Sequence, residues 1–122
     1  MNRQKLYRLF WQFLIGLLIL NLGVLVIKNL VKQPRPTTIL KDYSFPSQHS
    51  ANAFFLATFV AGLPFWQKKS QSKKRLFFCL GLLVMASIVA YSRIYLNVHY
   101  WSDVIFGSII GVIMAIISRK LF

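Results

Sequence analysis

Residues 9–27 read LFWQFLIGLLILNLGVLVI, a stretch of 19 residues without a charged side chain. A helix of about 20 predominantly apolar residues spans the hydrocarbon core of a bilayer. Three further apolar stretches follow at residues 51–66, 76–91 and 101–117, and the last contains Gly107 and Gly111, a short GxxxG ridge that indicates close helix packing. The sequence therefore predicts an all-α integral membrane bundle with about four transmembrane helices, formed by residues 1–122 as a single domain.

The composition agrees with a membrane protein. Hydrophobic residues make up 57% of the chain, aromatic residues make up 16%, and the mean hydropathy is +0.57, more than a small soluble domain exposes. A net charge of +13 on a soluble surface would indicate nucleic-acid binding, but here the basic residues lie between apolar stretches, so we expect no nucleic-acid partner. The single cysteine, Cys79, lies in an apolar stretch and excludes an internal disulfide.

The positions of the basic residues predict an orientation in the membrane. Arg3, Lys5 and Arg8 precede the first apolar stretch as in a secretory signal, but that stretch is long and no small-residue cleavage site follows, so we expect an uncleaved first helix. Cytoplasmic loops retain positive charge. Ten of the 15 Lys and Arg residues lie in the N-terminal segment, residues 68–75 and the C-terminal end, which predicts cytoplasmic termini in a plasma membrane.

The other side holds three polar segments, and the first is KNLVKQPRP at residues 28–36. Pro34 and Pro36 disfavour helical geometry, so the chain should leave the helix by about Gln33. Arg35 then lies in a stiff extended segment, where its guanidinium can bind two phosphate oxygens while Lys28 adds a point charge. The alternative is that Lys28 extends to the membrane interface and Arg35 is ordinary loop charge.

The second polar segment, FPSQHS at residues 45–50, stands directly before an apolar stretch. A helix that begins here directs its first backbone amides outward, which favours anions. Either Ser47 or Ser50 is suited to cap this helix, and Ser47 is also suited to donate to a phosphate oxygen. His49 is placed to protonate a leaving group, and the alternative is an interfacial histidine without a catalytic role.

The third polar segment, SRIYLNVHYWSD, covers residues 92–103. If the last helix begins by His99, the four-residue spacing places Asp103 on the same helix face as the imidazole. That carboxylate would keep one ring nitrogen protonated and leave the other free to attack phosphorus. Alternatively, Asp103 is only a favourable charge at a helix N-terminus.

Together the three segments resemble the motifs of the type 2 phosphatidic acid phosphatase superfamily. That family has Lys, six residues and ArgPro, then ProSerGlyHis, then SerArg, five residues, His, three residues and Asp. Residues 28–103 reproduce this order and spacing through Lys28, Arg35, Pro36, Pro46, Ser47, Gln48, His49, Ser92, Arg93, His99 and Asp103.

The resemblance implies a role for each matching residue. His99 is implied as the nucleophile that forms a phosphohistidine, Asp103 orients it, and His49 is the general acid. The phosphate-binding residues implied by the resemblance are Lys28, Arg35, Ser47, Gln48 and Arg93. No metal or other cofactor is implied, and the two acidic residues of the chain would make a poor magnesium site.

The chain departs from the family pattern in two respects. Gln48 replaces a glycine that lets the backbone approach the phosphate, although its own amide still offers a donor. Membrane members of the family usually have six helices, and two N-terminal helices are missing by comparison, so we expect a homodimer or a partner subunit to cover the exposed face. These departures leave open a truncated, inactive relative that acts as a membrane interaction protein.

The location of the polar segments predicts the substrate class. A phosphate site at the outer end of a helical bundle can receive the headgroup of a lipid whose tail stays in the membrane, so a lipid phosphate is expected. Among the substrates that the resemblance implies, we place undecaprenyl diphosphate first, ahead of phosphatidylglycerol phosphate and phosphatidate. A transporter-like bundle is disfavoured because its ionisable groups would lie near the midplane and not at one end.

Overall fold

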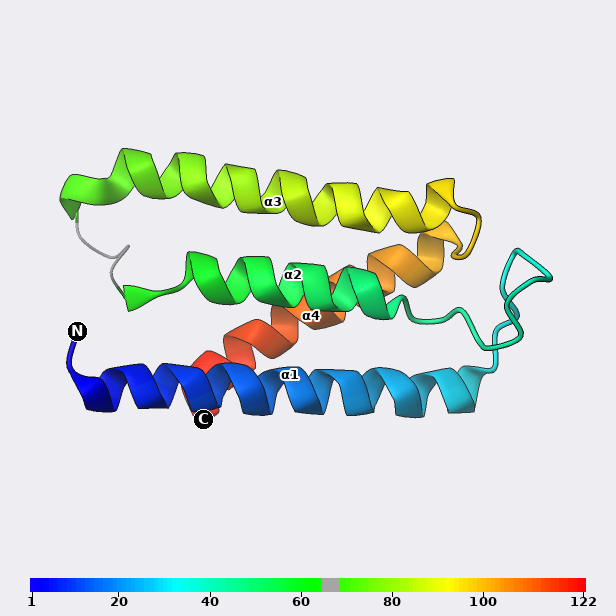
Figure 1. The fold of residues 1–122 in the computed structure, drawn as a ribbon, viewed down its shortest axis with the longest axis horizontal. Coiled ribbons are helices and arrows are strands. Elements are labelled where there is room, and N and C mark those ends of the chain that lie inside the picture. The colour runs from blue at the N-terminus through cyan, green and yellow to red at the C-terminus, as the bar shows by residue number, and fades with distance from the viewer. Residues whose placement is uncertain (65–68) are drawn as a thin grey trace.

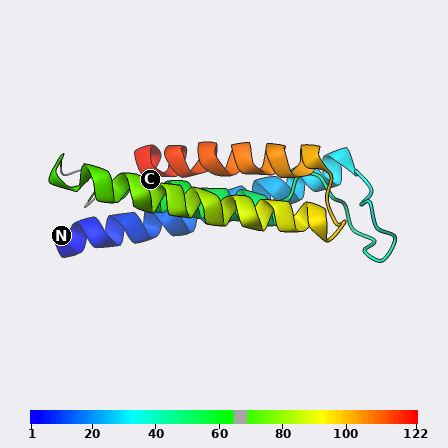
Figure 2. The ribbon, with the colours of Figure 1, turned by 90° about the horizontal axis from the view of Figure 1, so that it is seen from above.

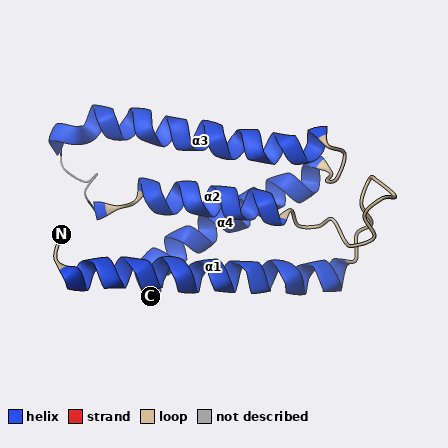
Figure 3. Cartoon of the chain, viewed as in Figure 1, coloured by secondary structure: helices blue, strands red, loops and turns tan. Residues whose placement is uncertain are grey.

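The chain folds into a bundle of helices. The computed structural model describes residues 1–64 and 69–122. Its elements are α1 (Arg3–Val31), α2 (Gln48–Ala61), the short 3₁₀ helix η2 (Lys69–Gln71), α3 (Ser72–Tyr95) and α4 (Trp101–Leu121). Within those residues the regular structure is helical, apart from an isolated β-bridge between Pro34 and Tyr43 (Figure 3). The predicted all-α bundle is confirmed.

The helices form two layers. Figure 1 shows α1, α2 and α3 running alongside one another, and α4 crosses them diagonally. Seen from above in Figure 2, α4 lies on one side of the other three helices. Helix α4 packs mainly on α2 and next on α1. Both termini lie toward one end of the bundle, and the segments that join α1 to α2 and α3 to α4 lie at the other end (Figure 1).

Three helices are long and apolar enough to cross a membrane: Arg3–Val31, Lys69–Tyr95 and Trp101–Leu121. Helix α2 has only 14 residues, which is about 21 Å of helix against a hydrocarbon core of about 30 Å. Helix α2 replaces the helix predicted at residues 51–66 and begins three residues earlier, at Gln48. It ends at Ala61 because Gly62 and Pro64 follow. Residues 65 and 66 of that predicted helix and Lys68 of the predicted inner loop lie outside the described residues. The protein is a multi-pass membrane protein.

The contact between α2 and α4 depends on two glycines. A Cβ added at Gly107 would lie 2.5 Å from the Ser47 carbonyl oxygen, and one added at Gly111 would collide with the Ala51 carbonyl oxygen. The GxxxG ridge therefore serves helix packing within the chain, as predicted. The apolar core beside it consists of Leu20, Val24, Ala51, Phe55, Phe59 and Ala115.

Most of the other large apolar side chains are exposed on the outside of the bundle. Examples are Leu18 and Leu22 on α1 and Ile88 on α3, which are all more than half exposed. An apolar exterior of this kind suits a lipid environment, where helix association depends on close packing more than on the hydrophobic effect.

Candidate active site

A cavity of about 310 Å³ lies at the end of the bundle opposite the termini. It forms where the C-terminal end of α1 meets the loop to α2, the start of α2 and the loop before α4. Its lining contains five of the eight predicted site residues: Lys28, Arg35, Gln48, His49 and His99. The three polar segments of the sequence, separated by up to 75 positions, thus meet at one place. Ser47, Arg93 and Asp103 do not line the cavity, but Asp103 contacts it through His99.

Arg35 is held on both edges of its guanidinium. Its Nε and Nη2 atoms donate to Asp42 Oδ1 and Oδ2, at 2.8 and 2.9 Å. Its Nη1 donates to the Val98 carbonyl oxygen at 3.0 Å and lies 3.3 Å from His99 Nε2. The antiparallel bridge between Pro34 and Tyr43 folds the loop back so that Arg35 and Asp42 face each other. A fixed cation therefore stands directly against one ring nitrogen of His99.

The other ring nitrogen of His99 faces Asp103. His99 Nδ1 lies 3.5 Å from Asp103 Oδ2, and both side chains are almost completely buried. This is an ion-pair distance, longer than a good hydrogen bond, and catalytic hydrogen bonds are often long before substrate binds. A proton on Nδ1 directs the lone pair of Nε2 toward Arg35 and the cavity.

Asp103 also shapes the start of α4. The helix begins at Trp101 and not at His99, and Asp103 Oδ2 accepts the Tyr100 backbone N–H at 2.8 Å. The helical turn assumed from the sequence is therefore absent at His99, and the contact forms because the loop before α4 brings the imidazole to the first turn. In the structure, Asp103 both faces His99 and provides a negative charge at the N-terminus of α4.

The surroundings of His99 keep its imidazole neutral. Burial, followed by the nearby charges of Arg35 and Lys28, lowers the pKa of His99 from 6.5 to about 4, although Asp103 acts in the opposite direction. A neutral imidazole has a free lone pair and is able to act as a nucleophile near pH 7.

His49 lies in the first turn of α2, which is not among the three candidate spans. Ser47 caps this helix by accepting the Ser50 backbone N–H, and its hydroxyl donates to the Ser50 hydroxyl at 3.0 Å. The choice between the two serines is thus resolved in favour of Ser47 as the cap. Burial, and then the Arg93 charge, lower the pKa of His49.

Lys28 enters the site from the last turn of α1, where its side chain is buried and its Nζ donates to the Tyr43 carbonyl oxygen at 3.0 Å. The helix ends at Val31, followed by Lys32 in a left-handed conformation with φ 55°. The predicted exit from the helix by Gln33 is confirmed.

A cluster of amide side chains beside the cavity was not predicted from the sequence. Gln48 Nε2 donates to Asn21 Oδ1 at 2.6 Å, and Asn21 and Asn52 exchange hydrogen bonds at 3.0 and 3.2 Å. Gln48, which replaces the family's glycine, therefore links α2 to α1. Asn21 and Asn52 are polar residues within apolar stretches, and that was the only sequence signal of this cluster.

Asp42 was also missed as a site residue. It is one of only two acidic side chains in a chain of net charge +13, and it lies seven residues after Arg35. Within the described part of the chain, no three His, Cys, Asp or Glu side chains gather as a metal site. Apart from Asp42, the charged side chains and imidazoles that line the cavity are those of Lys28, Arg35, His49 and His99, a set suited to an anion.

The fold and site define a multi-pass helical membrane protein with a cationic cavity that contains two histidines. The chain belongs to the PAP2 superfamily, because the model of that family matches residues 9–122.

Relatives in several organisms are similar to this chain. It is 37% identical over 116 residues to dolichyldiphosphatase 1 of Homo sapiens, an alignment that covers 84% of this chain and 48% of that protein. It is 33% identical over 120 residues to phosphatidylglycerophosphatase B of Bacillus subtilis, covering 88% of this chain and 57% of the relative. The chain therefore spans about half the length of these relatives. No solved structure matches it significantly.

Proposed function

We propose that this protein is a membrane phosphatase that hydrolyses a lipid phosphate or diphosphate through a phosphohistidine intermediate. The observation that supports it most directly is the environment of His99: Nε2 faces the cavity 3.3 Å from Arg35 Nη1, and Nδ1 lies 3.5 Å from Asp103. With the proton on Nδ1 facing a carboxylate, the lone pair of Nε2 would attack phosphorus once the substrate phosphate draws Arg35 Nη1 away from it. This is the geometry of an activated nucleophile.

In the proposed reaction, the Nε2 lone pair of His99 attacks phosphorus. The nitrogen–phosphorus bond forms as the bond from phosphorus to the leaving oxygen breaks, and His49 donates a proton to that oxygen. Water then attacks the phosphohistidine and gives a proton to His49, which releases inorganic phosphate and restores neutral His99. Burial and then the Arg93 charge lower the pKa of His49, and the negative charge of a bound phosphate would act in the opposite direction and favour the protonated ring that the first step needs.

The proposed phosphate ligands are Lys28, Arg35, Ser47, Gln48 and Arg93. Lys28 and Arg35 already line the cavity and would neutralise the charge on the non-bridging oxygens. Gln48 also lines it, although its amide nitrogen is bonded to Asn21. Arg93 Nε is buried and has no hydrogen-bond partner among the described residues, so this N–H is available to donate to an anion.

A lipid substrate follows from the position of the cavity at one end of a bundle with an apolar exterior. The names of the relatives support a polyprenyl diphosphate or a glycerophosphate lipid. We propose undecaprenyl diphosphate as the substrate, with phosphatidylglycerol phosphate as the alternative that the second relative suggests. Residues 1–122 would act as one domain.

For orientation, we propose that the cavity faces the outside of a plasma membrane and that the termini are cytoplasmic. This proposal is supported by the excess of Lys and Arg residues at the end of the bundle where both termini lie. Single cysteines placed at Lys41 and Ser70 in a Cys79→Ser background test it on whole cells. An impermeant thiol reagent should label position 41, and labelling of position 70 alone would reverse the orientation.

The activity is tested with purified protein, a chelator and a panel of lipid phosphates that includes undecaprenyl diphosphate, phosphatidylglycerol phosphate and phosphatidate. The parent should release inorganic phosphate, and His99→Ala should not. Cys79→Ser, which is remote from the cavity, serves as the matched control and should retain activity. Absence of release from every substrate by folded parent protein would instead favour an inactive membrane interaction protein.

The sequence also leads us to propose a homodimer, in which a second copy covers part of the exposed helical surface. Light scattering of the detergent-solubilised protein, corrected for bound detergent, measures the protein mass. A mass of two chains is expected, and a monodisperse monomer that retains full activity would exclude this proposal.

A further inference from the structure

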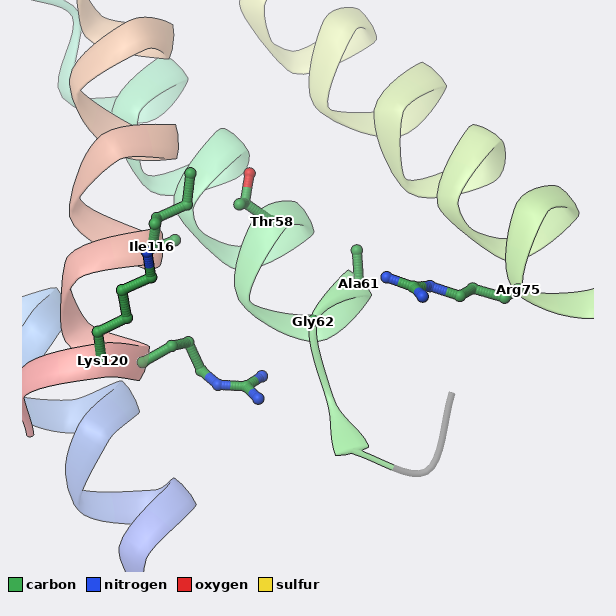
Figure 4. Close-up of a pocket in the computed structure, with 8 residues that line it drawn as sticks. Thr58, Ala61, Gly62, Arg75, Ile116 and Lys120 are labelled. Atoms are coloured by element: carbon green, nitrogen blue, oxygen red, sulfur yellow. The ribbon is translucent and has the colours of Figure 1, made fainter. Parts of the chain in front are cut away.

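A second cavity, of about 320 Å³, lies at the opposite end of the bundle from His99. It is bounded by the end of α2, the first turn of α3 and the last turns of α4 (Figure 4). Arg75, Arg119 and Lys120 line it, together with Thr58 and Gly62 and the apolar side chains Ala61, Ala115 and Ile116. Its size is at the lower end of the range of ligand pockets, about 300–1,000 Å³.

The three cations approach this cavity from two different helices. Figure 4 shows the Arg75 side chain extending from α3 toward Ala61 and Gly62, and Lys120 extending along α4 toward Ile116. Arg119 is fixed by a hydrogen bond of 3.3 Å from Nη1 to the Phe59 carbonyl oxygen, and its guanidinium lies over the Phe59 ring at 5.4 Å. The three positive side chains therefore line one open cavity.

No carboxylate side chain balances these charges. The only acidic side chains in the sequence, Asp42 and Asp103, belong to the loop and the helix start at the other end of the bundle. The C-terminal ends of α2 and α4 have negative dipoles, but each amounts to about half a charge. Together with the positive N-terminal end of α3 they offset about half of one charge, and the terminal carboxylate of Phe122 offsets at most one more of the three cations. An excess of positive charge remains, and an anion in the cavity would relieve it.

We propose that this second cavity binds the phosphate of an anionic glycerophospholipid. Arg75 and Arg119 both line the cavity, and guanidinium groups are suited to hydrogen bonds with phosphate oxygens. The apolar side chains Ala61, Ala115 and Ile116 would meet the first carbons below the headgroup. Basic pockets between transmembrane helices bind anionic headgroups in this way. Inorganic phosphate carries the same negative charge as the lipid headgroup, but it has no carbon chain to contact the apolar side chains of the cavity.

The test uses an Arg35→Gln background, which weakens the active-site cavity as a competing phosphate site. Short-chain phosphatidylglycerol, short-chain phosphatidylcholine and inorganic phosphate are titrated separately into detergent-solubilised protein, and binding is followed by native mass spectrometry and by the melting temperature. We expect phosphatidylglycerol to bind and to raise the melting temperature. Phosphatidylcholine and inorganic phosphate should have little effect.

Two pairs of substitutions with the same change of charge locate the site. Arg75→Gln with Lys120→Gln removes two cations from the cavity, whereas Lys5→Gln with Lys74→Gln removes two exposed cations elsewhere. The first pair should weaken phosphatidylglycerol binding by about tenfold or more, and the second should leave it almost unchanged. Equal weakening by both pairs would show that only overall charge matters and would overturn the proposal.

Two further results bear on the identity of the ligand. If inorganic phosphate binds as tightly as phosphatidylglycerol, the lipid assignment is wrong. Should the double variant fail to fold, Lys120→Gln alone tests the same site, because this exposed side chain carries no packing role. Its binding of phosphatidylglycerol should fall severalfold, and unchanged binding would contradict the proposal.

Discussion

Asp42 engages Arg35 through two parallel hydrogen bonds, from Nε to Oδ1 at 2.8 Å and from Nη2 to Oδ2 at 2.9 Å. A carboxylate bound in this way occupies the edge of the guanidinium that a phosphate would use. The Arg35 hydrogen bond lowers the pKa of Asp42, so the carboxylate stays charged at neutral pH. Under the proposed function, a substrate phosphate that binds this edge of Arg35 would have to displace Asp42.

Asp42→Asn should consequently strengthen phosphate binding. The amide cannot neutralise Arg35, but the side chain of Asp42 is 64% exposed, so solvent screens the ion pair and the effect is modest. We expect KM and the inhibition constant of inorganic phosphate to fall about threefold, with kcat nearly unchanged. Asp42→Glu is the control that retains the charge. If Asp42 instead holds Arg35 in its working position, KM will rise in Asp42→Asn.

The protonation of His99 gives a second prediction. Because its pKa in the folded protein is about 4, below the ordinary 6.5, the unfolded chain binds more protons between these values. The His99 contribution to stability is therefore present above pH 6.5 and decreases as the pH falls toward 4. His49→Gln leaves one histidine in the chain, so its ring signals can be followed by NMR. Titration near pH 4 is expected, and a midpoint of 6 or above would contradict it.

A further variant identifies the cause of that low pKa. Arg35 lies 3.3 Å from His99 Nε2, and its charge opposes protonation of the ring. Arg35→Gln in the His49→Gln background should raise the midpoint of the His99 titration. Arg8→Gln, which removes an exposed cation at the opposite end of α1, is the matched control and should leave the midpoint unchanged.

Asp103→Asn separates orientation of the nucleophile from folding. The amide oxygen can still accept the Tyr100 backbone N–H, so the start of α4 should persist. What is lost is the negative charge that faces His99 Nδ1 at 3.5 Å and selects the tautomer. We expect kcat to fall by about 10²- to 10⁴-fold, with little change in KM or melting temperature. A parallel loss of activity and thermal stability would mean that Asp103 has only a structural role.

The sequence predicted the fold class because apolar stretches are local signals, whereas most of the cavity residues were predicted from the order and spacing of three motifs that resemble those of a family. Apolar stretches define the helices, the two prolines end α1, and the spacing of His99 and Asp103 is short enough to bring them together. Asp42 was missed because its contact with Arg35 depends on how the loop of residues 32–47 turns back, which the backbone bridge from Pro34 to Tyr43 decides. The Gln48 contact with Asn21 depends on the relative position of α1 and α2, which no local pattern specifies.

The glycines of α4 lead to the last prediction. Ser47 donates its backbone N–H to the Asp103 carbonyl oxygen at 3.0 Å, so the start of α2 and the start of α4 are joined beside the site. Gly107→Ala would place a Cβ 2.5 Å from the Ser47 carbonyl oxygen, which is backbone and cannot rotate away. We expect the helices to separate, with a loss of about 1–3 kcal/mol in stability and a lower kcat, because His49 follows Ser47 on α2. Gly81→Ala is the control, since a Cβ there meets nothing within 4 Å. Thermal melts and phosphate release from the two variants measure the difference, and equal behaviour would show that the close approach of α2 and α4 does not position the site.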